Sequence, residues 1–176
     1  MNDQSNVILQ KKLYFMVEKL KDFHSRLDED IQNRIPLENL ITMANVLAND
    51  EHIFDVVGKL NEYQNAAEEM YKKQRDDQIR NDQKEIESYM ATLNDNEEIL
   101  HTIHLLKKQH AQKLKELDKA IIQNLDLLVK EQANTLSILG LPQFFETNDN
   151  KQIICQMHLL SFILKLQKLM EGQNFS

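Results

Sequence analysis

Turn-forming residues are scarce in this chain of 176 residues, and that scarcity restricts its fold more than any other sequence feature. Only 3 glycines and 2 prolines are present. A β-sandwich or β-barrel needs a turn about every 8–12 residues and relies on such residues to make them. Long helices need few turns, and helix formers such as Leu, Gln, Lys and Glu are abundant here. The sequence therefore predicts an all-α fold of about five helices.

The first segment carries an apolar residue at every third or fourth position, which is typical of an amphipathic helix. This spacing predicts a first helix within residues 1–35 that presents one apolar stripe. We expect the stripe to form a protein-interaction surface, because an unpaired apolar helix face needs a partner. The stripe consists of Leu9, Leu13, Met16, Leu20, Phe23 and Leu27.

Two long segments of nearly equal length, 53–93 and 95–139, dominate the middle of the chain. As helices each would extend about 60 Å. Asp95 and Glu98 form a capping box at the start of the second helix, so a short turn after Leu93 would make the two antiparallel. The seam of the first thins to Ile79, Ile86 and Leu93, which suits a slender coiled coil. We expect a long antiparallel helical hairpin.

Shorter helices at 36–49 and 149–171 complete the prediction. Pro36 suits the first turn of one, and Asp149 with Gln152 forms a capping box for the other. Residues 149–171 are apolar on most sides, which favours a central position in a small helical bundle at the hairpin base. Together the segments predict a single elongated helical domain over residues 1–176.

The loop after residue 139 combines a helix-ending glycine and proline with two adjacent aromatics. Each phenylalanine would stabilise the fold by about 1.5–3 kcal/mol on burial, so we expect at least one to fill the hairpin base. Gly58 lies inside a helix at a cost of about 1 kcal/mol, which favours close approach of another helix or of this loop over a plain kink. The residues predicted to pack at the hairpin base are Ile53, Phe54, Val57, Gly58, Gly140, Pro142, Phe144 and Phe145.

Composition excludes several classes of protein. The net charge of −7 disfavours general nucleic-acid binding, which needs a basic excess. The single Cys155 forms no internal disulfide, and the N-terminus lacks the apolar core of a signal peptide. Polar residues interrupt the apolar segment 153–170, so we expect no membrane insertion. An intracellular protein of the nucleus or cytoplasm is the expectation.

Chemically reactive residues are present but lack supporting patterns. His101 and His104, with His110 and Glu97, offer too few ligands in sequence for a tetrahedral zinc site. Cys155 has only His158 nearby as a base. No phosphate-binding loop, dinucleotide fingerprint or hydrolase motif occurs. We therefore expect no enzyme activity, no metal and no cofactor.

The basic segment Lys107–Lys119 admits two interpretations. It could meet an acidic partner, a membrane surface or RNA. Alternatively, its lysines pair with acids on the antiparallel helix, such as Glu85 and Glu87. We favour pairing, because exposed charge runs usually serve solubility and local ion pairs.

Three stretches carry a resemblance to a known family. "IFDVVGKLNEYQNAAEE" (53–69), "EQANTLSILGLPQFFET" (131–147) and "QMHLLSFILKLQ" (156–167) resemble signatures of the gonadal protein family, also called the DiGeorge syndrome critical region six family. The resemblance is collinear over roughly residues 9–169. It implies a small coiled-coil protein of the nucleus and cytoplasm, without known catalytic activity, linked to gonadal expression, neural-crest development and protein–protein contacts.

The residues and the resemblance together suggest a non-enzymatic coiled-coil adaptor or scaffold that binds protein partners through helical surfaces, with a homodimer as one form. The alternative is a structural subunit of a larger intracellular complex, in which the hairpin acts as a spacer.

Overall fold

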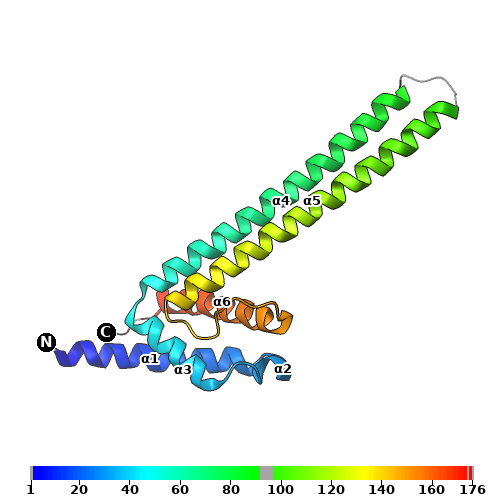
Figure 1. The fold of residues 1–176 in the computed structure, drawn as a ribbon. Helices are drawn as coiled ribbons and strands as arrows, with labels where there is room; N and C mark the ends of the chain where they lie inside the picture. Colours follow the sequence, from blue (N-terminus) through cyan, green and yellow to red (C-terminus); the bar gives the residue numbers. More distant parts are fainter. Residues whose placement is uncertain (1, 92–96, 174, 176) are drawn as a thin grey trace. The chain divides into compact units, whose positions relative to one another are not determined.

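The computed structural model describes residues 2–91, 97–173 and 175. Every regular element in these ranges is an α-helix, so the predicted all-α class is confirmed (Figure 1). Six helices are described where about five were expected. They are α1 (Asn2–Ser25), α2 (Glu29–Gln32), α3 (Leu37–Asn49), α4 (His52–Ala91), α5 (Glu97–Ile138) and α6 (Asn150–Glu171).

The chain divides into two compact units, where the sequence predicts a single domain. Unit 1 comprises Met1–Glu62 with Val129–Ser176, and unit 2 comprises Tyr63–Leu128. The first turns of α4 and the last turns of α5 therefore belong to unit 1, and their remaining lengths form unit 2.

The helix expected over residues 1–35 ends at Ser25, because hydrogen bonds fix a turn after it. Leu27 N–H donates to the His24 carbonyl at 3.1 Å, and Gln32 Nε2 donates to the Leu27 carbonyl at 2.7 Å. The His24 ring lies 3.0 Å from the Ile35 carbonyl oxygen. Side chains of His24 and Gln32 thus satisfy backbone groups that a continuous helix would have paired itself.

Two ion pairs attach the α2 region to the start of α6. Lys151 pairs with Asp30, and Arg34 Nη1 donates to Asp149 Oδ2 at 2.9 Å. Hydrogen bonds from these two basic side chains lower the pKa of both carboxyls from the ordinary 3.8. The pairs therefore stabilise the fold above that pH and are lost as the pH falls through the lowered pKa values, a small effect for exposed groups.

The core of unit 1 is built where α1 contacts α3 and α6. The Phe23 ring of α1 stacks against Phe162 of α6 with centroids 5.4 Å apart. The first turns of α4 and the last turns of α5 contribute Val57 and Leu136, both inaccessible to solvent. Other side chains exposed by no more than 1% are Met16, Leu20, Ile35, Leu40, Met43, Ala44, Leu47, Cys155, Leu159, Ile163 and Leu166.

The apolar stripe of α1 is part of this core, so the expectation of a free interaction surface is wrong for it. Met16 and Leu20 are fully buried. The other four stripe residues are partly buried and pack against the core: Leu9, Leu13, Phe23 and Leu27. The chain covers the stripe itself, because α3 and α6 supply the apolar partner that the sequence alone could not identify.

The loop after α5 ends the helix as a Schellman motif. Gly140 has φ of +82°, its N–H donates to Ser137 O at 2.9 Å, and Leu141 N–H donates to Leu136 O at 3.1 Å. Phe144 is 3% exposed and shares the core cluster with Ile53, Phe54 and Val57, as the hairpin-base prediction requires of at least one phenylalanine. Phe145 remains 49% exposed.

Two buried glutamines of α6 hold this loop in place. Gln152 Nε2 donates to Gln143 Oε1 at 2.9 Å, and Gln156 Nε2 donates to the carbonyls of Gln143 and Phe145 at 3.1 and 2.9 Å. Gln143 has φ of +71°, a conformation that these contacts support. Asp149 caps α6 through Lys151 N–H at 2.9 Å, but Gln152 serves the loop and does not complete the predicted capping box.

By length and composition α6 is long and apolar enough to cross a membrane, and no other described helix is. The core helix of a folded domain has the same length and composition. Met157 is 61% exposed, so α6 has one side in solvent. The expectation that this helix has neighbours on all sides is therefore wrong. Seven of its residues are buried in unit 1: Gln152, Cys155, Gln156, Leu159, Phe162, Ile163 and Leu166.

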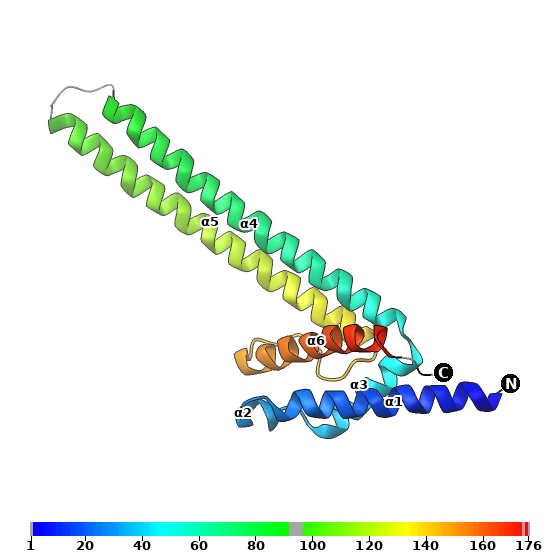
Figure 2. The same cartoon turned by 180° about the vertical axis from the view of Figure 1, so that it is seen from behind.

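In unit 2, α4 and α5 lie side by side in both views (Figure 1, Figure 2). Contacts join Arg75 to Asp118 and Glu85 to His110, so the two helices are antiparallel. Coiled-coil packing of the pair stays a prediction. The turn after Leu93 and the Asp95–Glu98 capping box lie outside the residues whose side chains are described.

The predicted close approach at Gly58 is wrong, because a Cβ built there meets no atom within 4 Å. Gly58→Ala should therefore raise the free energy of unfolding by about 0.5–1 kcal/mol through better helix propensity. Gly140→Ala should lower it by about 1 kcal/mol, because φ of +82° strains a side chain. Urea unfolding followed by circular dichroism measures both, and destabilisation by Gly58→Ala would show that a neighbour does fill the space.

The two adjacent phenylalanines should respond differently to truncation. Phe144→Ala should cost about 3–5 kcal/mol of unfolding free energy, since it empties a buried site. Phe145→Ala should change it by no more than about 0.5–1 kcal/mol, since half of that side chain is already in water. Equal losses in the same unfolding experiment would contradict the burial difference.

Candidate functional site

Unit 2 buries very little of itself. Among its described side chains only Ile103 and His110 count as buried, each 7% exposed. Helices obtain most of their stability from tertiary packing, and two paired helices bury only the residues along their single line of contact. Unit 2 is therefore the least tightly packed part of the described chain, and its side chains are candidates for a binding site.

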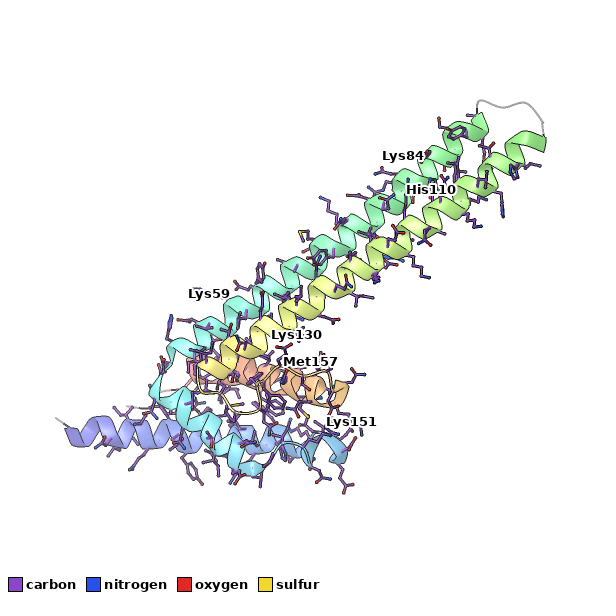
Figure 3. The ribbon with its side chains drawn as sticks, viewed as in Figure 1. Lys59, Lys84, His110, Lys130, Lys151 and Met157 are labelled. Carbon is purple, nitrogen blue, oxygen red and sulfur yellow. The ribbon has the colours of Figure 1, made fainter. Side chains whose placement is uncertain are left out.

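His110 is the polar centre of the unit 2 seam and lies between the two helices (Figure 3). Its Nε2 is 3.0 Å from Glu85 Oε2 and 3.7 Å from Asp82 Oδ1. Asp82 Oδ1 also accepts a hydrogen bond from Gln78 Nε2 at 2.8 Å. A buried histidine that donates to a carboxylate on the facing helix fixes the register of an antiparallel pair.

The same three residues are candidates for a metal site, because their ligand atoms lie within 4.8 Å of one another. Three ligands leave a tetrahedral site incomplete, and a ligating histidine usually donates its other ring N–H to a carboxylate or carbonyl. Here His110 Nδ1 has no partner among the described residues. The hydrogen bonds of Asp82, Glu85 and His110 already account for this geometry, so we interpret the cluster as structural.

The structure does not bring the histidines of the H-x-x-H motif into this cluster. His101 and His104 are exposed, whereas His110 is buried. The side chain of Glu97 lies outside the described residues. Periodicity could not single out His110, because a polar residue in a seam reads as a surface residue until the facing acids are known.

The lysines of Lys107–Lys119 do not form the expected pairs with Glu85 and Glu87. Glu85 faces His110, and no ion pair of a lysine in this segment is found among the described residues. The charged contact that does form is Arg75 with Asp118, at 2.7 Å and 3.3 Å through two guanidinium nitrogens. The lysine side chains of the segment therefore remain available to a partner.

A groove of about 420 Å³ lies between α4 and α5 beside His110. Its walls are mainly apolar, and charged side chains stand on both sides. Lining residues of α4 are Ile79, Asp82, Gln83, Ile86 and Glu87, and those of α5 are Lys107, His110, Ala111 and Leu114. An open apolar groove between two helices is the shape that accepts another helix.

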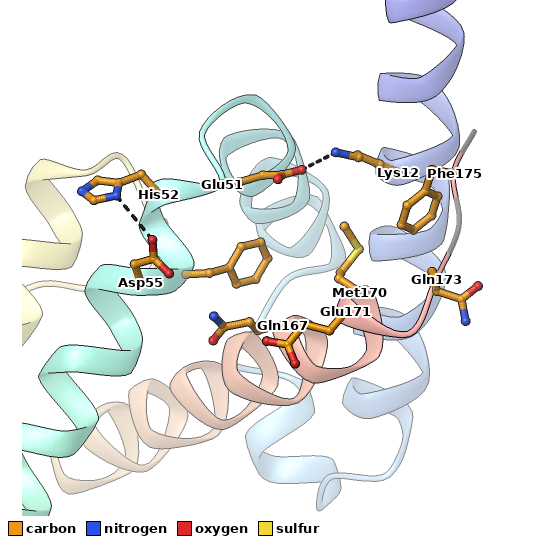
Figure 4. A pocket seen from close by; sticks show the side chains of 10 residues that line it. Lys12, Glu51, His52, Asp55, Gln167, Met170, Glu171, Gln173 and Phe175 are labelled. Atoms are coloured by element: carbon orange, nitrogen blue, oxygen red, sulfur yellow. Dashed lines mark hydrogen bonds and ion pairs between the residues drawn. The ribbon is translucent and has the colours of Figure 1, made fainter.

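Unit 1 has a surface groove of about 570 Å³ (Figure 4). Phe54, Met170 and Phe175 provide its apolar part. Two of its acids are already paired, Glu51 with Lys12 and Asp55 with His52, whose Nδ1 lies 3.6 Å from the carboxylate. Because these charges pair with each other, they give no indication of a ligand for this groove.

Cys155 has the environment of a structural thiol. It is 0% exposed, and burial raises the pKa of its side chain. The His158 ring stacks against Phe162 at 6.4 Å. A nucleophilic cysteine needs exposure and a lowered pKa, so this geometry gives no support to a Cys–His catalytic pair.

Truncation of His110 tests its role in unit 2. His110→Ala should lower the unfolding free energy by about 1–3 kcal/mol, since it removes a buried side chain and leaves Glu85 without its donor. His104→Ala, at an exposed position six residues earlier on the same helix, should change it by no more than about 0.5 kcal/mol. Urea unfolding of the two variants compares them, and equal effects would contradict the proposed difference.

Comparison with known proteins assigns the chain to a family. The family model for the DiGeorge syndrome critical region 6 (DGCR6) protein matches residues 1–174. The Gonadal protein gdl of Drosophila melanogaster is 39% identical over 161 residues, which cover 92% of this chain and 82% of that protein. No solved structure matches. With a match over nearly its whole length, the chain belongs to the DiGeorge syndrome critical region 6 family.

Proposed function

We propose that this chain is a non-enzymatic helical adaptor, a protein that binds other proteins through the surfaces of its helix pair in unit 2. The observation that carries the proposal is the small core of that unit, in which only Ile103 and His110 are buried among the described side chains. A helix pair with so few buried contacts gains stability when a partner covers it.

Exposed apolar side chains on unit 2 support a protein as the partner. Burying one such side chain contributes about 1.5–3 kcal/mol, so several together supply useful affinity even after the entropy cost of association. Their distribution along both helices suits a helical partner that lies along the pair. The exposed large apolar residues of this unit are Tyr63, Met70, Ile79, Tyr89, Met90, Leu100, Leu105, Ile122 and Leu127.

The family is named for the DiGeorge syndrome critical region, and the matched Drosophila relative is named a gonadal protein, which supports a developmental role as part of this proposal. We propose a role in the nucleus or cytoplasm, without nucleic-acid binding or membrane insertion. A structural subunit is the second candidate, because two long paired helices could also serve as a spacer within a fixed complex.

Affinity purification from native tissue, with quantitative mass spectrometry, tests the adaptor role. We expect wild-type protein to recover at least one other protein reproducibly. A variant that replaces five exposed apolar residues with Gln, a strong helix former, should lose that partner at least tenfold while it keeps its helix content. The replacements are Met70→Gln, Leu100→Gln, Leu105→Gln, Ile122→Gln and Leu127→Gln.

The matched control replaces exposed asparagines of the same unit: Asn65→Gln, Asn81→Gln and Asn124→Gln. The control should retain the partner. Equal recovery by the apolar variant, or no reproducible partner for the wild type, would refute the proposed adaptor. Cross-linking mass spectrometry then separates the two candidates, because a subunit shows a fixed stoichiometric set of partners and an adaptor shows varied, transient ones.

A further inference from the structure

We infer that a second copy of this chain covers the groove between α4 and α5 of unit 2. The same surface of both copies takes part, so that two α4 helices and two α5 helices share one core. The inference rests on the proposed function, because it identifies one of the partners that the helix pair binds. Its evidence is the arrangement of apolar and charged residues about the groove.

Apolar residues extend the groove along both helices. Eleven residues make about three helical turns, so positions that far apart lie on the same side of a helix. Leu100 and Ile122 stand eleven residues before and after Ala111, a groove residue, and Met90 stands eleven after Ile79. Leu100, Ile122 and Met90 are 71%, 60% and 55% exposed. We call this surface, with the groove, the groove face.

The groove face is large enough for a stable dimer. The part of α4 within unit 2, residues 63–91, is about 44 Å long at 1.5 Å per residue, and two adjacent helices are about 20 Å wide. Covering that area on each copy would bury about 1,700 Å² in total, within the range of specific protein–protein interfaces. A single partner helix would cover only part of it.

The charges beside the groove match a second copy. Residues 107–119 of α5 contain five lysines against Glu116 and Asp118, a net charge of +3. The facing residues 75–87 of α4 contain five acids against three basic residues, a net charge of −2. Of these charged residues, Asp82 and Glu87 line the groove on α4 and Lys107 lines it on α5. The groove therefore has an acidic and a basic edge, and its surface complements itself when a two-fold axis brings unlike edges together.

Charge also selects between the two face-to-face arrangements. A two-fold axis parallel to the helices places α4 of one copy over α5 of its partner, with neighbouring helices antiparallel and Glu87 at the level of the partner's Lys107. An axis across the helices would place α4 over α4 and set acid against acid. Like charges that face each other at an interface repel, so the first arrangement is the dimer that we propose.

The first test measures the mass of the purified full chain by light scattering over a range of micromolar concentrations. We expect the wild type to be a dimer. Ala111→Arg should weaken dimerisation at least tenfold, because Ala111 is an exposed residue of the groove and the long side chain obstructs the second copy. Both residues favour helix, so the helix pair itself should keep its stability.

Ala120→Arg is the matched control for this variant. Ala120 is exposed and lies nine residues after Ala111 on α5, or two and a half turns, which places it on the opposite side of the helix. This variant should remain a dimer. A monomeric wild type, or equal dimerisation of the two variants, would overturn the inference.

Cross-linking of two single-cysteine additions tests the arrangement. When Gln83→Cys chains are mixed with Ala111→Cys chains, mild oxidation should produce disulfides between the two kinds of chain in preference to pairs of one kind. Both positions are exposed residues of the groove, and the native Cys155 is fully buried. The control mixture of Asn81→Cys with Lys113→Cys uses exposed positions that do not line the groove and should cross-link weakly.

A preference for disulfides within one kind of chain would overturn the proposed arrangement. The outcomes also separate this inference from the adaptor role. A monomeric wild type that still recovers another protein from tissue defeats the second copy alone. A dimer that recovers no other protein supports the second copy and defeats the adaptor.

Discussion

Burial of apolar side chains where α1 contacts α3 and α6 is the interaction on which the rest of the structure depends. The side chains of Met16, Leu47 and Ile163 are withdrawn completely from water there. At about 1.5–3 kcal/mol each, a cluster of such residues can offset the entropy of ordering several helices. This core also fixes the first turns of α4 and the last turns of α5, since Val57 and Leu136 belong to it.

Unit 2 has no comparable apolar core among its described residues. Beyond the core, α4 and α5 carry mostly polar residues, and their contacts include a single buried histidine and one Arg–Asp ion pair. Polar contacts of this kind fix the register of two helices more than they stabilise them. Large apolar residues remain exposed on this unit, which is why both the proposed adaptor role and the proposed second copy involve unit 2.

Residue type predicted local roles in this protein but not contacts between distant segments. Gly140 and Asp149 performed the local tasks that their residue types suggest, ending α5 and capping α6. The contacts of Gln152 and Gln156 with the loop could not be predicted, and the capping role expected of Gln152 is wrong, because the loop groups that a helical glutamine meets are known only from the structure. Gly58 misled for a related reason: its cost in a helix is visible in the sequence, but the space around it is not.

The sequence showed the histidines of the candidate site but not which of them is buried. His110 is one of three histidines in a short stretch, and only the facing Glu85 and Asp82 distinguish it from His101 and His104.

By itself the sequence determined that this protein is helical, where most of its helices begin and end, and to which family it belongs. Helicity and helix ends depend on neighbouring residues along the chain, through propensity, capping and periodicity. The family is identified by similarity of the sequence to known proteins. Only the tertiary structure decided that the stripe of α1 is core and that few of the described side chains of unit 2 are buried. The physical reason is that an apolar stripe specifies burial but not its partner, and the partner depends on contacts between residues distant in the chain.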